Sequence, residues 1–438
     1  MEDAKQLWLQ WQQYLNEFAT EFTAPGWVHF AQWATGMVLC DEQHTITQII
    51  TSLGFQEEWR NWEKFAEYGV WDERGVEQCL IELADREAPA RFAGYRPVAV
   101  DDTKELRWSL DVWGVCTFKH AGRNANRPKL VRGHNWVVAG DLSPGAPWLY
   151  RPLTGRLYIR AAQLPPNEVF HTKLEQAVEM LGQMNAGSAA PVLGVFDGGF
   201  ARQNLVRPCS QCPRPIRILT RPRSDARLYA ALPPKAQGGG KKKRGGRPRK
   251  WGKRLPAPKK HGRWGVAWEE GWAYIYGKRR KFRCQRLECR WSVAGPDVPV
   301  VAFVFQVEGY KKDWYLVTTA VELSSAQAVE AYAARFRQED GIRDQKQRLG
   351  MEEVRAWTKK PVLRTFLVQT VAMCLLRLMQ SWLERQRGPD WNPAPPWNPH
   401  KRYVSILDLR RLFWAHREEF SQFMQSLGEV EKTRRRAA

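Results

Sequence analysis

Two short apolar segments that end on acidic residues constrain the fold of this chain more than any other feature. "YRPVAVDDT" ends with Asp101 and Asp102 before its threonine, and "APVLGVFDGG" carries Asp197 before two glycines. Short apolar runs bounded by turn residues are typical of strands buried on both faces. Three expected strands, a helix and a further strand follow one another along this part of the chain, so we expect a mixed α/β sheet. Further strands are expected in "RWSLDVWGVCTFKH", "HNWVVAGDLS", "VPVVAFVFQVEG" and "DWYLVTTAV".

Helical patterns lie on either side of these strands. Before residue 95, helices are expected in "KQLWLQWQQYLNEFATEF", "TITQIITSLG", "EEWRNWEKFAEYG" and "ERGVEQCLIELADR", with Thr45 opening the second and Gly54 ending it. These helices fit a helix-turn-helix DNA-binding module or a helical cap on the core, and both interpretations stay open. Later helices are expected in "NEVFHTKLEQAVEMLGQM", over 361–385 and from near Ser405. The segment 361–385 carries arginine and glutamine within its apolar run, which favours a buried helix over a membrane span.

The composition points to a polyanionic partner. The 438 residues include 68 Lys or Arg and 46 Asp or Glu, which gives a formal net charge of +22. A balance this basic is typical of proteins that bind nucleic acid, and the 22 tryptophans offer rings that can stack on bases. No basic leader precedes an apolar run at the N-terminus, so we expect no signal peptide and a cytoplasmic, nucleoid-associated protein. A metabolic enzyme is disfavoured because the chain lacks a phosphate-binding GxxxxGK[ST] loop.

A basic insert interrupts the strand pattern between residues 200 and 310. The stretch from Lys241 to Arg263 is rich in Lys, Arg, Gly and Pro and contains no acidic residue. Gly246-Arg247-Pro248 resembles the core of an AT-hook, which would enter a narrow minor groove; the alternative is a flexible polycation on phosphates. In both cases this segment is predicted to bind DNA. The candidate residues are Arg247, Arg249, Lys250, Lys253 and Arg254.

The cysteines allow two interpretations. Cys209 and Cys212 have zinc-ligand spacing, whereas Cys284 and Cys289 are further apart and about seventy residues away. We weigh a structural zinc against free thiols in a reducing compartment, and we expect free thiols.

Four polar residues, which we call the polar stripe, are aligned on one face of a predicted helix, and they are candidates for a functional site. In "AYAARFRQEDGIRDQKQRLG", Tyr332, Arg335, Glu339 and Lys346 recur at helical spacing, where a surface helix would normally place apolar residues. An exposed face with an ion pair between Arg335 and Glu339 would explain two of the four residues, but it leaves the tyrosine unexplained.

Carboxylates from two strand ends and one helix can hold a pair of metal ions. Ligands bind at the carboxyl edge of α/β sheets, where Asp101 or Asp102, Asp197 and Glu339 are expected to meet. Hard oxygen ligands suit Mg²⁺ or Mn²⁺, and two such ions support in-line attack at phosphorus. Each aspartate alone is more often a turn residue than a ligand.

Together these motifs resemble those of bacterial insertion-sequence transposases with an RNase H-like DDE core. The group in question carries the signature Y-x2-R-x3-E-x6-K, which Tyr332, Arg335, Glu339 and Lys346 match. Its first motif is an apolar strand followed by D-x-T. "VAVDDT" matches with Asp101, although Asp102 stays an alternative. Its second motif is matched by Asp197 in "LGVFDGGF", and the group also has a partly β insertion before its glutamate.

The resemblance implies a fold, a reaction and a set of residue roles. It implies an RNase H-like core holding two Mg²⁺ or Mn²⁺ ions on Asp101, Asp197 and Glu339. It implies cleavage of insertion-sequence ends and transfer of the 3′-hydroxyls into target DNA. The partners would be double-stranded DNA, as terminal inverted repeats and as target, and a second copy of the chain, with no membrane. Tyr332, Arg335 and Lys346 would contact phosphates. Trp314 would stack on a flipped base, or else pack under the sheet.

The resemblance also implies a domain layout. We expect a helical DNA-binding domain over 1–95, the first part of the core over 96–199 and the basic insertion over 200–310. The second part of the core would follow over 311–385, and a Pro-rich linker with a final helix over 386–438. Two rival functions remain: a catalytically inactive transposase derivative that binds DNA, and another RNase H-like DNA endonuclease.

Overall fold

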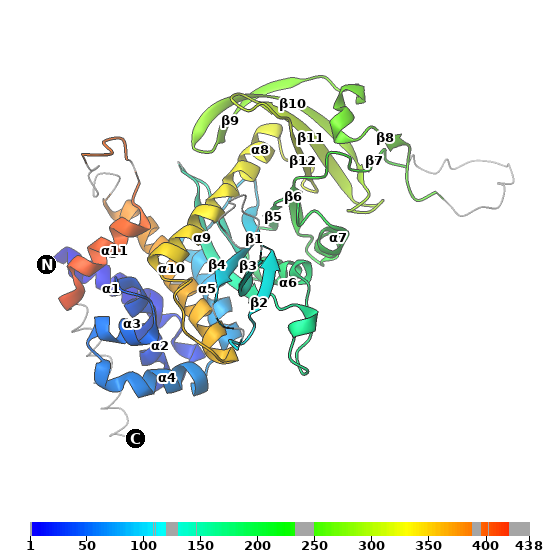
Figure 1. Cartoon of the computed structure of the whole chain (residues 1–438). Coiled ribbons are helices and arrows are strands. Elements are labelled where there is room, and N and C mark those ends of the chain that lie inside the picture. Colours follow the sequence, from blue (N-terminus) through cyan, green and yellow to red (C-terminus); the bar gives the residue numbers. More distant parts are fainter. Residues whose placement is uncertain are drawn as a thin grey trace.

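The computed structural model describes most of the chain: residues 2–107, 109, 111–119, 130–145, 147–232, 249–387, 396–401 and 403–419. A helical layer, a central mixed sheet and a strand-rich extension follow one another in space (Figure 1). The helical layer contains α1 (Glu2–Asn16), α2 (Ala24–Leu39), α3 (Ile46–Leu53), α4 (Trp59–Tyr68) and α5 (Glu73–Glu87).

The capping signals place α3 where the sequence predicts it. The Thr45 side chain accepts a hydrogen bond from the backbone N–H of Gln48, and Gly54 ends the helix in the left-handed region at φ 77°. Helix α2 was not predicted, because its residues from Val28 to Leu39 are apolar on nearly every side and leave no amphipathic pattern. Its start is nevertheless capped by Thr23.

The central sheet has the strand order of an RNase H-like fold. Its strands are β1 (Arg96–Leu106), β2 (Cys116–Lys119), β3 (Leu130–Ser143), β4 (Leu149–Leu157), β5 (Val192–Phe196) and β6 (Arg217–Thr220). They run in the order β4-β3-β1-β5-β6; β3 is antiparallel to both of its neighbours, β1 and β4, and β5 and β6 are parallel to β1. The expected mixed α/β fold is therefore confirmed.

One expected strand is shorter in the structure, and one observed strand was not expected. Only Cys116–Lys119 of the segment 107–120 is a strand among the described residues, and β4 was not predicted at all. The sheet also continues past residue 199, where the expected insert begins. α7 (Gln203–Gln211) and β6 follow directly, and β6 pairs in parallel with β5. The last strand of the RNase H-like order is therefore β6, which ends at Thr220.

The insert extends the same sheet. It contains β7 (Leu228–Tyr229), β8 (Arg254–Leu255), β9 (Glu269–Ile275), β10 (Lys278–Trp291) and β11 (Pro299–Val307), followed by β12 (Trp314–Thr318). β12 pairs with β6 on one side and with β11 on the other, so core and insert form one hydrogen-bonded sheet. Figure 1 shows these strands curving over α8.

Helices cover both faces of the central strands. Val98 and Val100 of β1 share an apolar cluster with α6 (Lys173–Ala186), α10 (Lys359–Arg387) and the N-terminal helices. Ala99, on the opposite face, packs in the cluster that contains α8 (Ser325–Ala334). Helix α9 (Phe336–Arg348) continues from α8, and α11 (Ile406–Ala415) starts after a capping box on Ser405. Helix α10 is long and apolar enough to cross a membrane, but 94% of its most apolar window is buried within the protein.

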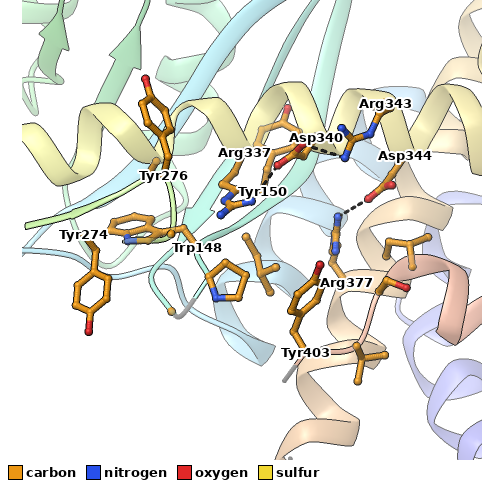
Figure 2. A pocket seen from close by; sticks show the side chains of 18 of the residues that line it. Trp148, Tyr150, Tyr274, Tyr276, Arg337, Asp340, Arg343, Asp344, Arg377 and Tyr403 are labelled. Carbon is orange, nitrogen blue, oxygen red and sulfur yellow. Dashed lines mark hydrogen bonds and ion pairs between the residues drawn. The ribbon is translucent and has the colours of Figure 1, made fainter. Parts of the chain in front are cut away.

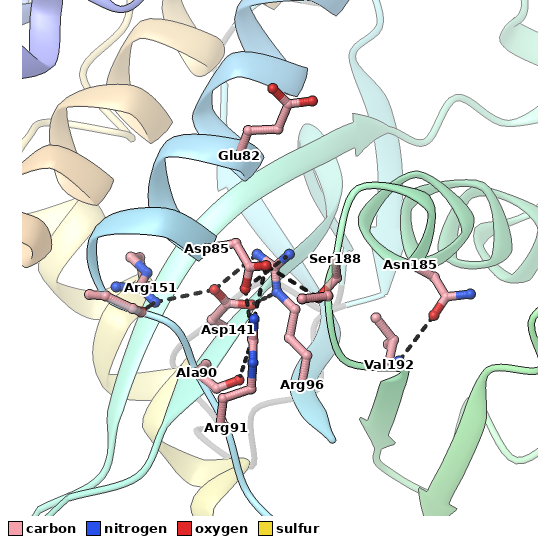
Figure 3. A network of polar contacts seen from close by, with 12 residues as sticks. Glu82, Asp85, Ala90, Arg91, Arg96, Asp141, Arg151, Asn185, Ser188 and Val192 are labelled. Atoms are coloured by element: carbon pink, nitrogen blue, oxygen red, sulfur yellow. Dashed lines mark hydrogen bonds and ion pairs between the residues drawn. The ribbon is translucent and has the colours of Figure 1, made fainter. Parts of the chain in front are cut away.

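A buried ion network ties α5 to three strands (Figure 3). Asp141 of β3 is fully buried and accepts hydrogen bonds from Arg96 Nε of β1 at 2.7 Å and from Arg151 Nη2 of β4 at 3.2 Å. Arg151 also donates to the carbonyl of Ala88 at 2.6 Å, and Asp85 of α5 lies 3.8 Å from Arg96. These contacts fix the helical layer against the strand that carries Asp101.

Candidate active site

The two aspartates of β1 lie beside the open end of β5. β1 does not end on Asp101 and Asp102, as the sequence predicts, but continues to Leu106 because β3 pairs with it along this whole stretch. β5 accompanies β1 only from Arg96 to Ala99. Asp197 follows the last residue of β5 and accepts a hydrogen bond from the N–H of Gly199 at 2.8 Å. The edge where β5 stops therefore carries acidic side chains from both strands.

The alternation of side chains along β1 separates Asp101 from Asp102. Asp101 Oδ2 accepts a hydrogen bond from Arg335 Nη1 at 2.9 Å, at the junction of α8 and α9. Asp102 Oδ2 instead pairs with Lys173 Nζ of α6 at 2.8 Å. Neighbouring residues of a strand face opposite sides, so only Asp101 lies on the side of Glu339.

The polar stripe lies on two helical segments joined at Arg335. A single helix is expected over residues 331–350, whereas α8 ends at Ala334 and α9 begins at Phe336. The backbone of Arg335 keeps helical angles (φ −50°, ψ −33°), so the helix axis continues. At the junction, backbone hydrogen bonds join residues three apart in sequence instead of four. The stripe is therefore retained across the junction.

Close contacts fix α9 on the sheet. Gln338 donates to the carbonyl of Val138 at 3.0 Å, and Lys346 Nζ donates to the carbonyl of Lys104 at 2.6 Å. Gly341 allows the approach, because a Cβ atom there would lie 2.4 Å from the ring of Tyr150. These contacts hold the stripe over the part of β1 that carries Asp101.

A guanidinium stands between two of the candidate metal ligands. Arg335 lies 2.9 Å from Asp101 Oδ2 and 3.5 Å from Glu339 Oε1. In the described part of the chain, no three His, Cys, Asp or Glu side chains are grouped closely enough to hold a metal ion. The oxygen donors are of the kind that Mg²⁺ prefers, but Arg335 occupies the position between them.

Tyr332 faces this site from a buried position. Its side chain is 7% exposed, and burial raises its pKa, an effect that the cations of Arg335 and Arg221 oppose. Asp197 raises the pKa of Tyr332 further, so the phenol lies within electrostatic reach of that carboxylate. Sequence reasoning missed Arg221, which follows β6 at the same edge as Asp197. Arg221 comes directly after the strand segment "RILT", just as Asp197 comes directly after β5, and this position is the signal that could have indicated it.

Trp314 begins β12 on the approach to this edge. The ring is half-buried, 5.0 Å from the ring of Tyr310 and 5.9 Å from that of Tyr276. Together with Arg221, Lys311 and Lys312 it lines a cavity of about 710 Å³. The indole therefore packs against aromatic neighbours and also borders an open cationic cavity.

The predicted DNA-binding residues of the insert lie far along the sheet from the acidic edge. Arg249, Lys250, Lys253 and Arg254 are exposed next to β7 and β8, the last strands of the sheet order. Arg247 and the AT-hook-like triplet fall outside the described residues.

The cysteines do not converge. Cys284 and Cys289 lie on opposite faces of β10 and are buried in two different apolar clusters. Cys209 is buried on α7, in the same cluster as Cys289. One ion cannot bind the four cysteines in this arrangement.

The opposite face of α9 lines a separate cavity of about 490 Å³ (Figure 2). Asp340 pairs there with Arg337 at 3.0 Å and with Arg343 at 2.9 Å, and Asp344 pairs with Arg377 at 2.8 Å. These acids are directed away from the stripe and are neutralised by adjacent arginines.

The environment of Asp101 predicts a pH-dependent cost to folding. Burial, with the nearby Asp197 and Asp102 adding to it, raises the pKa of Asp101 from 3.8 to about 6, although Arg335 opposes the shift. The folded protein therefore binds a proton that the unfolded chain releases between about pH 4 and pH 6, so this group lowers stability as pH rises through that window. We expect Asp101→Asn to melt at a higher temperature than the unmodified protein at pH 7, with the difference vanishing below about pH 4.

Calorimetry in chelator between pH 4 and pH 8 measures this difference. Asp102→Asn is the matched control, because it removes the negative charge that pairs with Lys173 on the other face of β1 and should not stabilise the protein. Parallel pH profiles for the unmodified protein and Asp101→Asn would contradict the prediction.

The strand order and the acidic edge are those of an RNase H-like nuclease. A family model described as DDE superfamily endonuclease matches residues 17–292, which include Asp101 and Asp197, and the chain belongs to this family. The expected DDE class is thereby confirmed at the level of this superfamily. Glu339 lies beyond the matched residues. Among solved structures, the chain is similar to a piggyBac transposase in a synaptic complex with hairpin DNA, with 10% identity, a TM-score of 0.41, and coverage of 90% of this chain and 71% of that one. A comparison with curated proteins gives no match.

Proposed function

We propose that this endonuclease is a cut-and-paste DNA transposase that cleaves the ends of an insertion sequence and joins the free 3′-hydroxyls to target DNA. The proposal is supported chiefly by one observation: Arg335 connects the carboxylate at the edge of the sheet, Asp101, with the carboxylate of the polar stripe, Glu339. Membership of the DDE superfamily of endonucleases supports hydrolysis of a phosphodiester as the first step. The net charge of +22 favours DNA as the partner.

Asp101, Asp197 and Glu339 are the residues that would hold divalent cations. Two bound Mg²⁺ or Mn²⁺ ions would activate the attacking water or hydroxyl and stabilise the leaving 3′-oxygen. The rest of the proposed chemistry belongs to the chain itself. Arg335, which now pairs with Asp101 and Glu339, is the guanidinium that would make a forked contact with a phosphate. Lys346, held at β1, adds a positive charge further along the same stripe.

The cavity beside Trp314 is the proposed position of a base flipped from the end of the element. Its cations, Arg221, Lys311 and Lys312, would neutralise the neighbouring phosphates, while the indole offers a face worth about 1–3 kcal/mol of stacking. In the cell we propose a cytoplasmic, nucleoid-associated protein that acts as a homodimer on two paired ends.

One experiment tests the function and the role of Trp314 together. Plasmid DNA carrying the sequences that flank the gene is incubated with the full chain in Mg²⁺, and nicked, hairpin and joined products are separated on gels. We expect excision and joining with the unmodified protein, and fewer hairpins but normal first-strand nicking with Trp314→Ala. Leu316→Ala, in the same strand, controls for loss of folding. Absence of any strand joining with the unmodified protein would favour a plain endonuclease, and an equal hairpin yield with Trp314→Ala would reject the stacking role.

A further inference from the structure

The β9–β10 hairpin presents an exposed face on which aromatic and cationic side chains alternate. The pairing places Arg279 opposite Tyr274, Lys281 opposite Trp272 and Arg283 opposite Glu270. All six side chains point to the same side, because they occupy alternate positions of both strands. The other side carries Phe282, Cys284, Ala273 and Ile275, which are buried in the apolar cluster that includes α8. We call the exposed side the ribbon face.

Two arginines on the ribbon face are supported by tryptophan rings. The guanidinium of Arg279 lies 5.2 Å from the ring centre of Trp272, and that of Arg283 lies 4.9 Å from the ring centre of Trp268. Stacking of this kind fixes a planar guanidinium without consuming its N–H donors. Among the described residues, neither arginine makes a hydrogen bond or an ion pair, so both retain their donors for a ligand.

The remaining charges of this surface leave it positive. Glu270 pairs with Lys281 at 2.7 Å, and the charge of Arg283, which lies opposite, also lowers the pKa of Glu270. One carboxylate against Lys281, Arg279 and Arg283 still leaves an excess of positive charge. Next to Trp268 lies the short helix Pro258–Arg263, whose His261 ring is 5.6 Å from the indole. Its Lys259, Lys260 and Arg263 are exposed and extend the positive surface.

The dimensions and direction of the ribbon face suit a duplex. Arg279 and Arg283 are four residues apart in one strand, which separates them by about 13 Å, close to the width of about 12 Å of the B-DNA major groove. The face points away from α8, so the thickness of the hairpin separates it from the acidic edge. Because the tryptophan rings are occupied by arginines, the exposed donors favour phosphates over stacked bases.

We propose that the ribbon face is a second DNA-binding surface, which binds the phosphates of duplex DNA outside the active site. The inference rests on the proposed function only in taking DNA as the partner. The phosphates come either from a distal part of the cleaved duplex or from a separate duplex, and both sources present the same chemistry.

The test measures binding of the full chain to labelled duplexes of arbitrary sequence in chelator, over a range of salt concentrations. Two lengths are used, about two and about four helical turns, or roughly 20 and 40 base pairs. For Arg279→Gln/Arg283→Gln we expect the affinity to fall roughly tenfold or more. The slope of log affinity against log salt concentration should decrease by the amount that corresponds to about two phosphate contacts. If the variant loses affinity only for the longer duplex, the ribbon face binds a distal part of the same DNA molecule. If the variant no longer binds a second equivalent of the shorter duplex, the ribbon face binds a separate DNA molecule.

The matched control is Arg86→Gln/Arg223→Gln. It removes the same charge from two exposed arginines whose guanidiniums are already paired, with Glu17 and Asp225 respectively. We expect its affinity and salt dependence to match the unmodified protein. Identical affinity and salt dependence for Arg279→Gln/Arg283→Gln and the unmodified protein, with both lengths, would overturn the proposal. Because cleavage is absent in chelator, this result is independent of whether the chain is a transposase.

Discussion

We expect Glu339→Ala to lose DNA cleavage in Mg²⁺ while it binds DNA as tightly as the unmodified protein. Glu339 is the one carboxylate of the polar stripe, and its only described contact is with Arg335 at 3.5 Å. The side chain is about half exposed, so its removal leaves no cavity and no buried unpaired group. Loss of a metal ligand that contributes several kcal/mol to the transition state corresponds to a thousandfold or greater loss in rate, by order of magnitude.

Asp340→Ala provides the control for this experiment. It removes an acidic residue from the same helix, adjacent in sequence, but its carboxylate faces the separate cavity of Figure 2 and pairs with Arg337 and Arg343. We expect cleavage close to that of the unmodified protein. Nicking of plasmid DNA and binding in chelator should be measured on the same preparations. Retained nicking by Glu339→Ala would refute the assignment of this residue.

The second large effect concerns stability rather than catalysis. We expect Asp141→Ala to lower the free energy of unfolding by about 3–5 kcal/mol, because two arginines would then remain buried without their carboxylate. Arg96 is fully buried and Arg151 is 3% exposed, so water cannot replace the lost partner. Arg96 would keep only its longer contact with Asp85, at 3.8 Å, as an ion pair, while Arg151 would keep its hydrogen bond to the carbonyl of Ala88.

The triple variant Arg96→Met/Asp141→Leu/Arg151→Met separates a charge effect from a packing effect. Replacing all three charges by apolar side chains leaves no buried ion unpaired, so we expect it to be more stable than Asp141→Ala. Urea denaturation followed by circular dichroism measures both variants. Equal destabilisation of the single and the triple variant would show that the network acts through shape and not through charge.

Local signals predicted much of this fold, while contacts between distant segments did not follow from the sequence. Thr45, Gly54 and Ser405 cap helices where their chemistry requires it, and those elements were predicted. Helix α2 was missed because burial on all sides removes the periodicity by which a helix is recognised. The full length of β1 was missed because pairing with β3, not composition, extends it beyond the aspartates.

The candidate site shows the same limit. Residue types and spacing predicted that Asp101 and Glu339 belong together, and the contacts of Arg335 bring both residues to one place. The position of that guanidinium between two carboxylates depends on the distance from α9 to β1, which Gly341 and Tyr150 set. No pattern within one segment encodes such a distance.

The pairing of β6 with β12 has a mechanical consequence. Because strand pairing continues from β5 and β6 through β12 into β11 and β10, the ribbon face is not a separately tethered module. Its separation from Asp101 is fixed by the spacing of the strands between them. A DNA molecule that touches both places must therefore match a separation that the protein sets.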